Sequence, residues 1–303
     1  MQQIQPYIGR RHVLVGLAAG ALVAACGRGS QSGTATTAKI KETDPVGWQL
    51  GARFADGYTA PSSIVAGSLQ RAPYVLLGTD GLPIDTEGPQ QLDFTIRQAG
   101  AEGTVVATHT VERHGGKPAT PYFPLVFQIN DPGDYVVHID NKSEPHNLRV
   151  IDVDQTELLQ IGDPLPATAT PTIADPKNVD PICTEPNGPC PFHEYSVTEA
   201  LARPGPVALL VSTPRFCQSD VCGPTVGLLR SAMRVRPEPW SVVHAEVYQR
   251  PEAGNFNTTP VVTALGLTFE PSLIVANSAG IITAALHFTM DNSEVVAAIE
   301  TAV

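Results

Sequence analysis

The sequence predicts a mixed α+β protein with two folded domains, an antiparallel β-sandwich followed by an α/β domain. Three observations support this prediction. The length of 303 residues is typical of about two domains. Short runs of alternating apolar and polar residues fill residues 59–155, as expected for a sandwich. Later in the chain, an apolar run leads into two closely spaced cysteines and a helix-like pattern.

The composition is that of a globular protein able to bury real cores, with 42% apolar and 16% charged residues. The 28 prolines and 26 glycines favour loops, linkers and β-structure over long helices. A formal net charge of −11, without a cluster of Lys and Arg, excludes nucleic acid and disfavours anionic lipid as a partner. The sequence has no nucleotide-binding loop, paired-carboxylate motif or serine elbow. We therefore expect no cofactor, and neither hydrolase nor kinase activity.

The first 26 residues are predicted to be a targeting segment. Arg10 and Arg11 precede the apolar run from Val13 to Ala25, which is too short to span a bilayer comfortably. The run ends at Cys26 in a Val-Ala-Ala-Cys sequence that resembles a bacterial lipobox, and the arginine pair resembles a twin-arginine export signal. The alternative is an ordinary secretory signal with a chance cysteine. The lipobox resemblance implies a lipid anchor at Cys26 on the extracytoplasmic face of the cell membrane, where disulfides persist.

Two connecting segments are predicted from composition. Residues 27–58 begin with a Gly-, Ser-, Thr- and Ala-rich stretch without apolar periodicity, and we expect a flexible tether. Residues 156–182 contain five prolines, which favour extended and semi-rigid chain, and we expect a linker between the domains.

The sandwich domain is predicted over residues 59–155. Asp131, Gly133 and Tyr135 resemble the tyrosine-corner segment of immunoglobulin-like domains, but Val137 stands where such domains often carry a cysteine. The sandwich is therefore expected to be held by apolar burial alone. Histidines within it alternate with apolar neighbours, which favours a solvated face over a metal site. The expected strands cover residues 74–77, 92–96, 104–108, 125–129, 135–139 and 147–151.

The segment that carries the chemistry follows the apolar run 207–211, which is bounded by prolines and predicts a buried strand. Cys217 and Cys222 come next. Since a proline inside a helix clashes with the carbonyl four residues earlier, Pro224 places the helix start near residues 221–223. Ser219 or Asp220 would then cap it. With a loop between the two cysteines, a Cys217–Cys222 disulfide becomes possible.

A strand that ends in a cysteine pair at the start of a helix resembles the thioredoxin fold, and Cys222-Gly223-Pro224 strengthens the resemblance. Thr225 replaces the second cysteine of the family's Cys-Gly-Pro-Cys motif. The resemblance covers residues 183–303 and implies a cis peptide at Pro271, facing the cysteines. It implies thiol–disulfide exchange with cysteine-containing exported proteins or a membrane redox partner. A helix start at Cys222 would favour its thiolate, whereas counting from the strand places Cys217 at the family's exposed position. Both assignments of the nucleophile remain open.

The other two cysteines, Cys183 and Cys190, flank a turn rich in Pro, Asn and Gly. Proximity in sequence favours pairing Cys183 with Cys190 among the three possible connectivities, as a structural disulfide. The alternatives are a metal site that adds His193, although the spacing fits no standard zinc ribbon, and a disulfide that exchanges with the redox pair.

Two further functions remain alternatives to exchange. Sco-type copper-delivery proteins are similar in their tethered thioredoxin-like fold and Cys-x3-Cys-Pro loop, and His244 or His287 would then join Cys217 and Cys222. The longer spacing in this chain weakens that resemblance. A binding or scaffold protein with a structural Cys217–Cys222 bridge is the other alternative.

Overall fold

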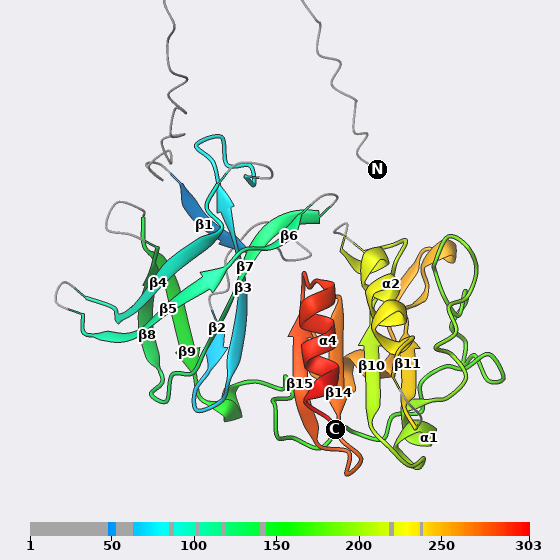
Figure 1. Ribbon diagram of the computed structural model, residues 1–303. Coiled ribbons are helices and arrows are strands. Elements are labelled where there is room, and N and C mark those ends of the chain that lie inside the picture. The colour runs from blue at the N-terminus through cyan, green and yellow to red at the C-terminus, as the bar shows by residue number, and fades with distance from the viewer. Residues whose placement is uncertain are drawn as a thin grey trace, which may run out of the picture. The chain divides into compact units, whose positions relative to one another are not determined.

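The computed structural model describes residues 48–52, 63–84, 88–100, 103–116, 119–139, 144–217, 221–236 and 239–303. The predicted targeting segment with Cys26, and most of the predicted tether, lie outside these residues. The described chain is a mixed α+β fold with many strands and few, mostly short helices (Figure 1). None of the described helices is long and apolar enough to cross a membrane.

The N-terminal part forms two sheets. One is antiparallel, with the order β1-β3-β7-β6. The other has the order β2-β9-β8-β4-β5 and is antiparallel except for the parallel β2–β9 pair. The strands are β1 (Gln49–Ala52), β2 (Ser63–Val65), β3 (Gln70–Leu77), β4 (Gln91–Gln98), β5 (Val105–Glu112), β6 (His114–Gly116), β7 (Ala119–Phe127), β8 (Gly133–His138) and β9 (His146–Ile151).

All six strands expected from alternation are present, and the structure adds the short strands β2 and β6 and, at the start of the described chain, β1. This strand lies within residues 27–58, which the composition had assigned to a tether, and Ala52 pairs with Tyr74 of β3. The tether assignment is therefore wrong for this segment. A four-residue strand that contains Gly51 is too short to show the period of two on which such predictions depend.

One hydrophobic core lies between the two sheets. In β4 the alternation places Phe94 and Ile96 inward, both almost fully buried, while Asp93 is exposed. Each such aromatic or aliphatic side chain contributes about 1.5–3 kcal/mol by leaving water. Val137 is fully buried in the same core, and the Tyr135 hydroxyl donates a hydrogen bond to the carbonyl of Asp131 at 2.8 Å.

The C-terminal part is built on a four-stranded sheet with the order β11-β10-β14-β15. Its central strand β10 (Val207–Val211) is parallel to β11 (Ser241–Ala245) and antiparallel to β14 (Ser272–Ala276), which pairs in turn with β15 (Ile282–His287). Val211 lies opposite both Ala245 and Ser272. The segments that follow β10 and β11 and the segment that precedes β14 therefore meet at one edge of the sheet.

Helices cover both faces of this sheet. Helices α2 (Cys222–Met233) and α4 (Asn292–Glu300) pack on one face, and α1 (Val197–Leu201) and α3 (Pro260–Ala264) pack on the other (Figure 1). Every residue of β10 is buried as a result. A strand covered on both faces has no outward position for polar residues, which explains its uninterrupted apolar sequence.

The ends of the helices partly follow the sequence. Helix α2 begins at Cys222 as predicted, with Val221 at the N-cap position and no side-chain cap. The expected caps Ser219 and Asp220 lie outside the described residues. Helix α4 is capped by Asp291, which accepts a hydrogen bond from the amide of Glu294 at 3.0 Å.

Two segments depart from regular structure. Strand β11 ends at Ala245, and β12 (Tyr248–Arg250), the short helix η2 (Pro251–Ala253) and β13 (Asn255–Thr258) follow. The predicted linker 156–182 has neither helix nor strand, yet Leu165 is buried in the core of the C-terminal part. Folded structure thus begins before residue 183, where the sequence had placed the domain boundary.

Candidate functional site

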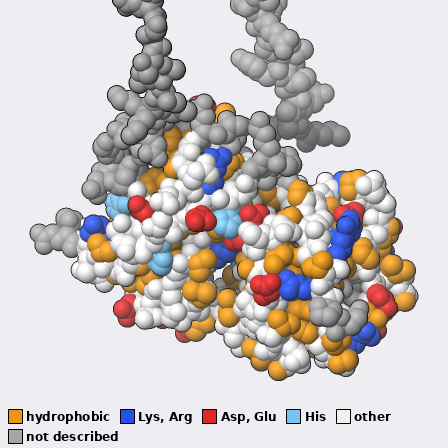
Figure 2. All heavy atoms as spheres, in the orientation of Figure 1, with side chains coloured by type: hydrophobic (Ala, Val, Ile, Leu, Met, Phe, Trp, Pro, Cys, Tyr) orange, Lys and Arg blue, Asp and Glu red, His pale blue; other side chains and the backbone are white. Residues whose placement is uncertain are grey.

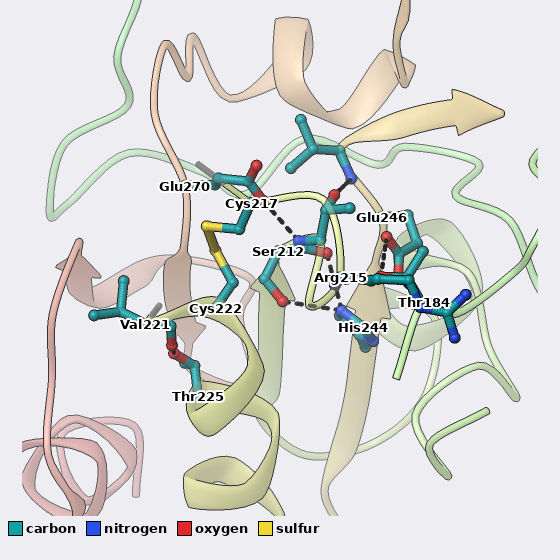
Figure 3. Close-up of a disulfide and its surroundings, with 12 residues drawn as sticks. Thr184, Ser212, Arg215, Cys217, Val221, Cys222, Thr225, His244, Glu246 and Glu270 are labelled. Carbon is teal, nitrogen blue, oxygen red and sulfur yellow. Dashed lines mark hydrogen bonds between the residues drawn. A yellow bond between two sulfur atoms is a disulfide. The ribbon is translucent and has the colours of Figure 1, made fainter. Parts of the chain in front are cut away.

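The site lies at the edge of the sheet where β10 and β11 end and β14 begins. The register places Ser212 between Glu246 and Pro271 there, because Val211 of the central strand pairs with Ala245 on one side and with Ser272 on the other. The peptide bond between Glu270 and Pro271 is cis, as the sequence predicted. This edge also receives the loop that carries Cys217 and the first turn of α2 (Figure 3).

Cys217 and Cys222 are joined by a disulfide, which is the pairing expected from their positions. Cys222 is the first residue of α2 and is fully buried, whereas Cys217 is only partly buried. The amide of Cys217 donates to the carbonyl of Thr213 at 2.9 Å, which turns the loop back toward the helix. Thr225, at the place of the missing cysteine, donates its hydroxyl to the carbonyl of Val221 at 2.6 Å.

A buried carboxylate, Glu270, lies beside this disulfide (Figure 3). One of its oxygens and the sulfurs of Cys217 and Cys222 all lie within 4.8 Å of one another. Glu270 accepts a hydrogen bond from the amide of Thr213 at 2.6 Å, and its burial raises its pKa to about 7. A carboxyl group with a pKa near neutrality can either give or take a proton at this place.

A second buried carboxylate, Glu246, lies on the far side of Ser212 from the disulfide in Figure 3. It accepts hydrogen bonds from the amide of Thr184 at 2.6 Å and from the Thr184 hydroxyl at 3.1 Å. Burial raises the pKa of Glu246 to about 7. The Thr184 hydroxyl also accepts a hydrogen bond from the amide of Arg215 at 3.2 Å, so the segment that begins at Cys183 contacts the loop that carries Cys217.

The other pair differs from the sequence-based expectation. Cys183 and Cys190 are free thiols and not a disulfide. Both are buried beside two imidazoles, those of His193 and His244. The hydrogen bond between the two thiols lowers the pKa of Cys183 well below its ordinary value and raises that of Cys190. His244 of β11 lies beside both sulfurs because of how the strands pair, and the spacing of the cysteines in the sequence gives no sign of this neighbour.

The copper alternative loses its third ligand in this arrangement. His244 lies with Cys183 and Cys190, not with Cys217 and Cys222. The Nδ1 atom of His287 lies 3.0 Å from the Ser272 hydroxyl, and burial lowers its pKa to about 3. Among the described residues, the only metal-capable side chain grouped with the disulfide sulfurs is Glu270.

Sequence reasoning missed Glu246 and Glu270. A glutamate directly after a buried strand, and another directly before Pro271, were the available signals.

The view in Figure 2 shows Lys and Arg side chains scattered over the described surface, without one basic patch on that face. No protein-family model and no curated protein matches this chain, so its function is argued from this geometry.

Proposed function

We propose that the protein is a membrane-tethered, extracytoplasmic thiol–disulfide exchange protein, with an immunoglobulin-like domain followed by a thioredoxin-like domain. The observation that carries the proposal is the disulfide between a partly exposed Cys217 and a buried Cys222 that opens helix α2. The buried carboxylate of Glu270 beside it, with a pKa raised by burial, supports a reactive rather than an inert bridge.

The thioredoxin-like assignment is supported by the order of elements around the cysteines. A central strand, β10, leads into the Cys217 loop and then into a helix that begins at Cys222. Pro271 stands immediately before the antiparallel hairpin β14–β15, and helix α4 closes the chain. Fold resemblance alone does not establish function. The order of elements shows only where the two sulfurs lie, between the end of β10 and the start of α2.

The immunoglobulin-like assignment is supported by strand order and by one side chain. Counted along the chain, β1, β3, β6 and β7 correspond to strands A, B, D and E of such domains, while β4, β8 and β9 correspond to C, F and G. The hydrogen bond from Tyr135 to the Asp131 carbonyl is the contact of a tyrosine corner.

The exchange step follows from which sulfur is accessible. A partner thiolate attacks the sulfur of Cys217, the Cys217–Cys222 bond breaks, and Cys222 leaves as a thiolate. At the start of α2, unpaired amide groups and the helix dipole stabilise that anion. A second thiol of the partner then attacks the mixed disulfide, so that the partner dithiol is oxidised and the cysteine pair is reduced. Run backwards, the same steps reduce a partner disulfide.

Glu270 is suited to the proton that accompanies this exchange. The leaving Cys222 thiolate takes up a proton to become a thiol, and it must lose that proton before it can attack in the reverse direction. A carboxyl group within 4.8 Å of both sulfurs, with a pKa of about 7, exchanges protons readily at neutral pH. Glu270 is therefore proposed as the proton donor and acceptor for Cys222.

Trapping of the mixed disulfide tests the proposal. The full chain with Cys222→Ser is incubated with oxidised glutathione, and peptide mapping by mass spectrometry locates the adduct. We expect a stable adduct on Cys217. The matched Cys217→Ser variant should form little adduct, because Cys222 is buried. Equal adducts in both variants, or none in either, would contradict the assigned roles.

The membrane tether is proposed on the sequence of the targeting segment. If Cys26 carries the lipid, the wild-type protein fractionates with membranes, and Cys26→Ala releases it into the soluble extracytoplasmic fraction. A Cys26→Ala protein that remains with the membranes would show that another segment holds it there.

A further inference from the structure

We propose that Cys183, Cys190, His193 and His244 form a closed, four-coordinate binding site for a zinc ion. The site is separate from the Cys217–Cys222 pair and does not depend on exchange activity. One ligand atom from each of the four residues can be chosen so that all lie within 4.8 Å of one another. Two thiolates and two imidazoles are the donor set of many structural zinc sites.

The distances between ligand atoms agree with tetrahedral coordination. With zinc–sulfur and zinc–nitrogen bonds of about 2.3 and 2.05 Å, adjacent sulfur and nitrogen ligands lie about 3.6 Å apart. His244 Nδ1 lies 3.8 Å from Cys183 Sγ and 3.4 Å from Cys190 Sγ. His193 Nε2 lies 3.3 Å from Cys190 Sγ. These three distances lie on both sides of the tetrahedral value, so a zinc ion requires only small adjustments of the side chains.

Burial makes the cluster costly unless its polar atoms are bound. The exposed fractions are 5% for Cys183, 2% for Cys190, 1% for His193 and 0% for His244. His193 Nδ1 is buried without a hydrogen-bond partner among the described residues. A polar group placed in an apolar core without a partner costs about 1–3 kcal/mol. The metal would bind Nε2 of this ring and not Nδ1, so its binding free energy would offset the cost of burial without giving Nδ1 a partner. Four protein ligands with no access for water are typical of a structural site.

The surroundings of His244 orient its ring toward the sulfurs. Its Nε2 lies 3.1 Å from the carbonyl oxygen of Ser212 and 3.0 Å from the Ser212 hydroxyl. With the ring proton on Nε2, where the carbonyl accepts it, the lone pair of Nδ1 points at Cys183 and Cys190. This is the outer-shell arrangement that metal-binding histidines commonly have. Figure 3 shows the contact between Ser212 and His244.

The site joins two segments that are distant in sequence. Cys183, Cys190 and His193 come from the irregular segment before α1, and His244 comes from β11. The amide of His244 donates to the carbonyl of Phe192 at 2.7 Å, which aligns this segment along the strand. A zinc ion would fasten the segment to the edge of the sheet. Thr184, next to Cys183, contacts the loop that carries Cys217 through Arg215.

Metal content and cysteine state test the proposal together. The full chain is purified anaerobically after zinc loading, and metal per chain is measured by elemental analysis and native mass spectrometry. We expect about one zinc per chain in the wild type and none in Cys190→Ser or His244→Gln. The matched control is the Cys217→Ser/Cys222→Ser double variant, which alters the other pair and should retain one zinc.

A second measurement uses the wild-type chain and so does not depend on the folding of any variant. Replacement of zinc by Co²⁺ should give the intense visible absorption of a four-coordinate ion, with sulfur-to-cobalt charge-transfer bands. Absence of that spectrum would overturn the proposal. So would a wild-type chain that binds no zinc at excess Zn²⁺, or a Cys183–Cys190 disulfide in peptide mapping.

Discussion

The two cysteine pairs lie in the same domain but have different surroundings. Cys217 is partly exposed, and its bonded partner opens a helix beside a carboxylate. Cys183 and Cys190 are buried and contact two imidazoles. Sequence separations of five and seven residues suggested the same outcome for both pairs, a local disulfide. The neighbours that strand pairing supplies make the difference. They are the basis of our two proposals, exchange for one pair and metal binding for the other.

The largest expected effect comes from removal of metal from the buried pair. Structural zinc sites contribute about 10–16 kcal/mol of binding free energy in small peptides, and much of it appears as folding stability. We expect a strong chelator to lower the free energy of unfolding of the C-terminal domain by at least about 4 kcal/mol. Chemical denaturation with and without chelator measures this change.

The control for chelation is the Cys217→Ser/Cys222→Ser double variant, which should respond to chelator as the wild type does. In Cys190→Ser the chelator should have no further effect. If the wild type is equally stable with and without chelator, the buried pair does not hold a structural metal and the contrast between the pairs disappears.

A smaller effect is expected from Glu270, which distinguishes the redox pair from the buried one. Its pKa is raised to about 7 by burial, so the folded state holds a proton that the unfolded state releases above about pH 4.5. Stability should therefore fall as pH rises from about 4.5 to about 7 and level off above. In Glu270→Gln this part of the decline, up to about 3 kcal/mol, should be absent.

Unfolding of the oxidised protein at a series of pH values measures this difference, since the bonded sulfurs do not titrate. A decline should remain in Glu270→Gln because the pKa of Glu246 is also raised. Glu157→Gln, at an exposed position, is the matched control and should keep the wild-type profile. Identical profiles for Glu270→Gln and wild type would show that Glu270 is ionised well below neutral pH.

Reduction of the Cys217–Cys222 bond should lower the free energy of unfolding by less than removal of the metal or the ionisation of Glu270 does. The loop that it closes spans a sequence separation of only 5 residues. Chain entropy assigns such a small loop about 2 kcal/mol. Unfolding of the protein with both cysteines reduced, compared with the oxidised form at saturating zinc, measures the effect. A loss well above this value would identify the bond as a structural bridge.

The smallest effect is expected from Ser212→Ala. The substitution removes the hydroxyl that lies 3.0 Å from His244 but leaves the carbonyl that holds the ring. Zinc affinity, measured by competition with a chelator, should therefore fall by less than about tenfold, at the lower end of outer-shell effects. Formation of the Cys217 adduct with glutathione should not change. A complete loss of zinc would mean that the hydroxyl, and not the carbonyl, orients the ring.

Much of the fold could be predicted from the sequence because its signals are local. Alternation located the sandwich strands, the continuous apolar run located β10, and Pro224 placed the start of α2 near Cys222. Gly51 and its short strand β1 gave no such signal. The cap of α4 cannot be chosen from the sequence, since Asp291, Asn292 and Ser293 are all capable caps and only the backbone geometry selects among them.

The site was less predictable because its parts meet through strand register. Cys217, Cys222 and Pro271 were found because they belong to a local motif or to a recognisable strand start. Glu270 and His244 were not assigned to their places, since nothing in the sequence states that Val211 pairs with Ala245 and Ser272. The metal alternative for Cys183, Cys190 and His193 lacked a fourth ligand for the same reason.

The most direct test of the central claim is the reduction potential of the Cys217–Cys222 pair. Thiol trapping in glutathione buffers, resolved by peptide mass, reports this pair separately from Cys183 and Cys190. An exchange protein should give a value between about −120 and −270 mV, the range of catalytic pairs. A potential below about −300 mV would mark a structural disulfide and contradict the proposed function.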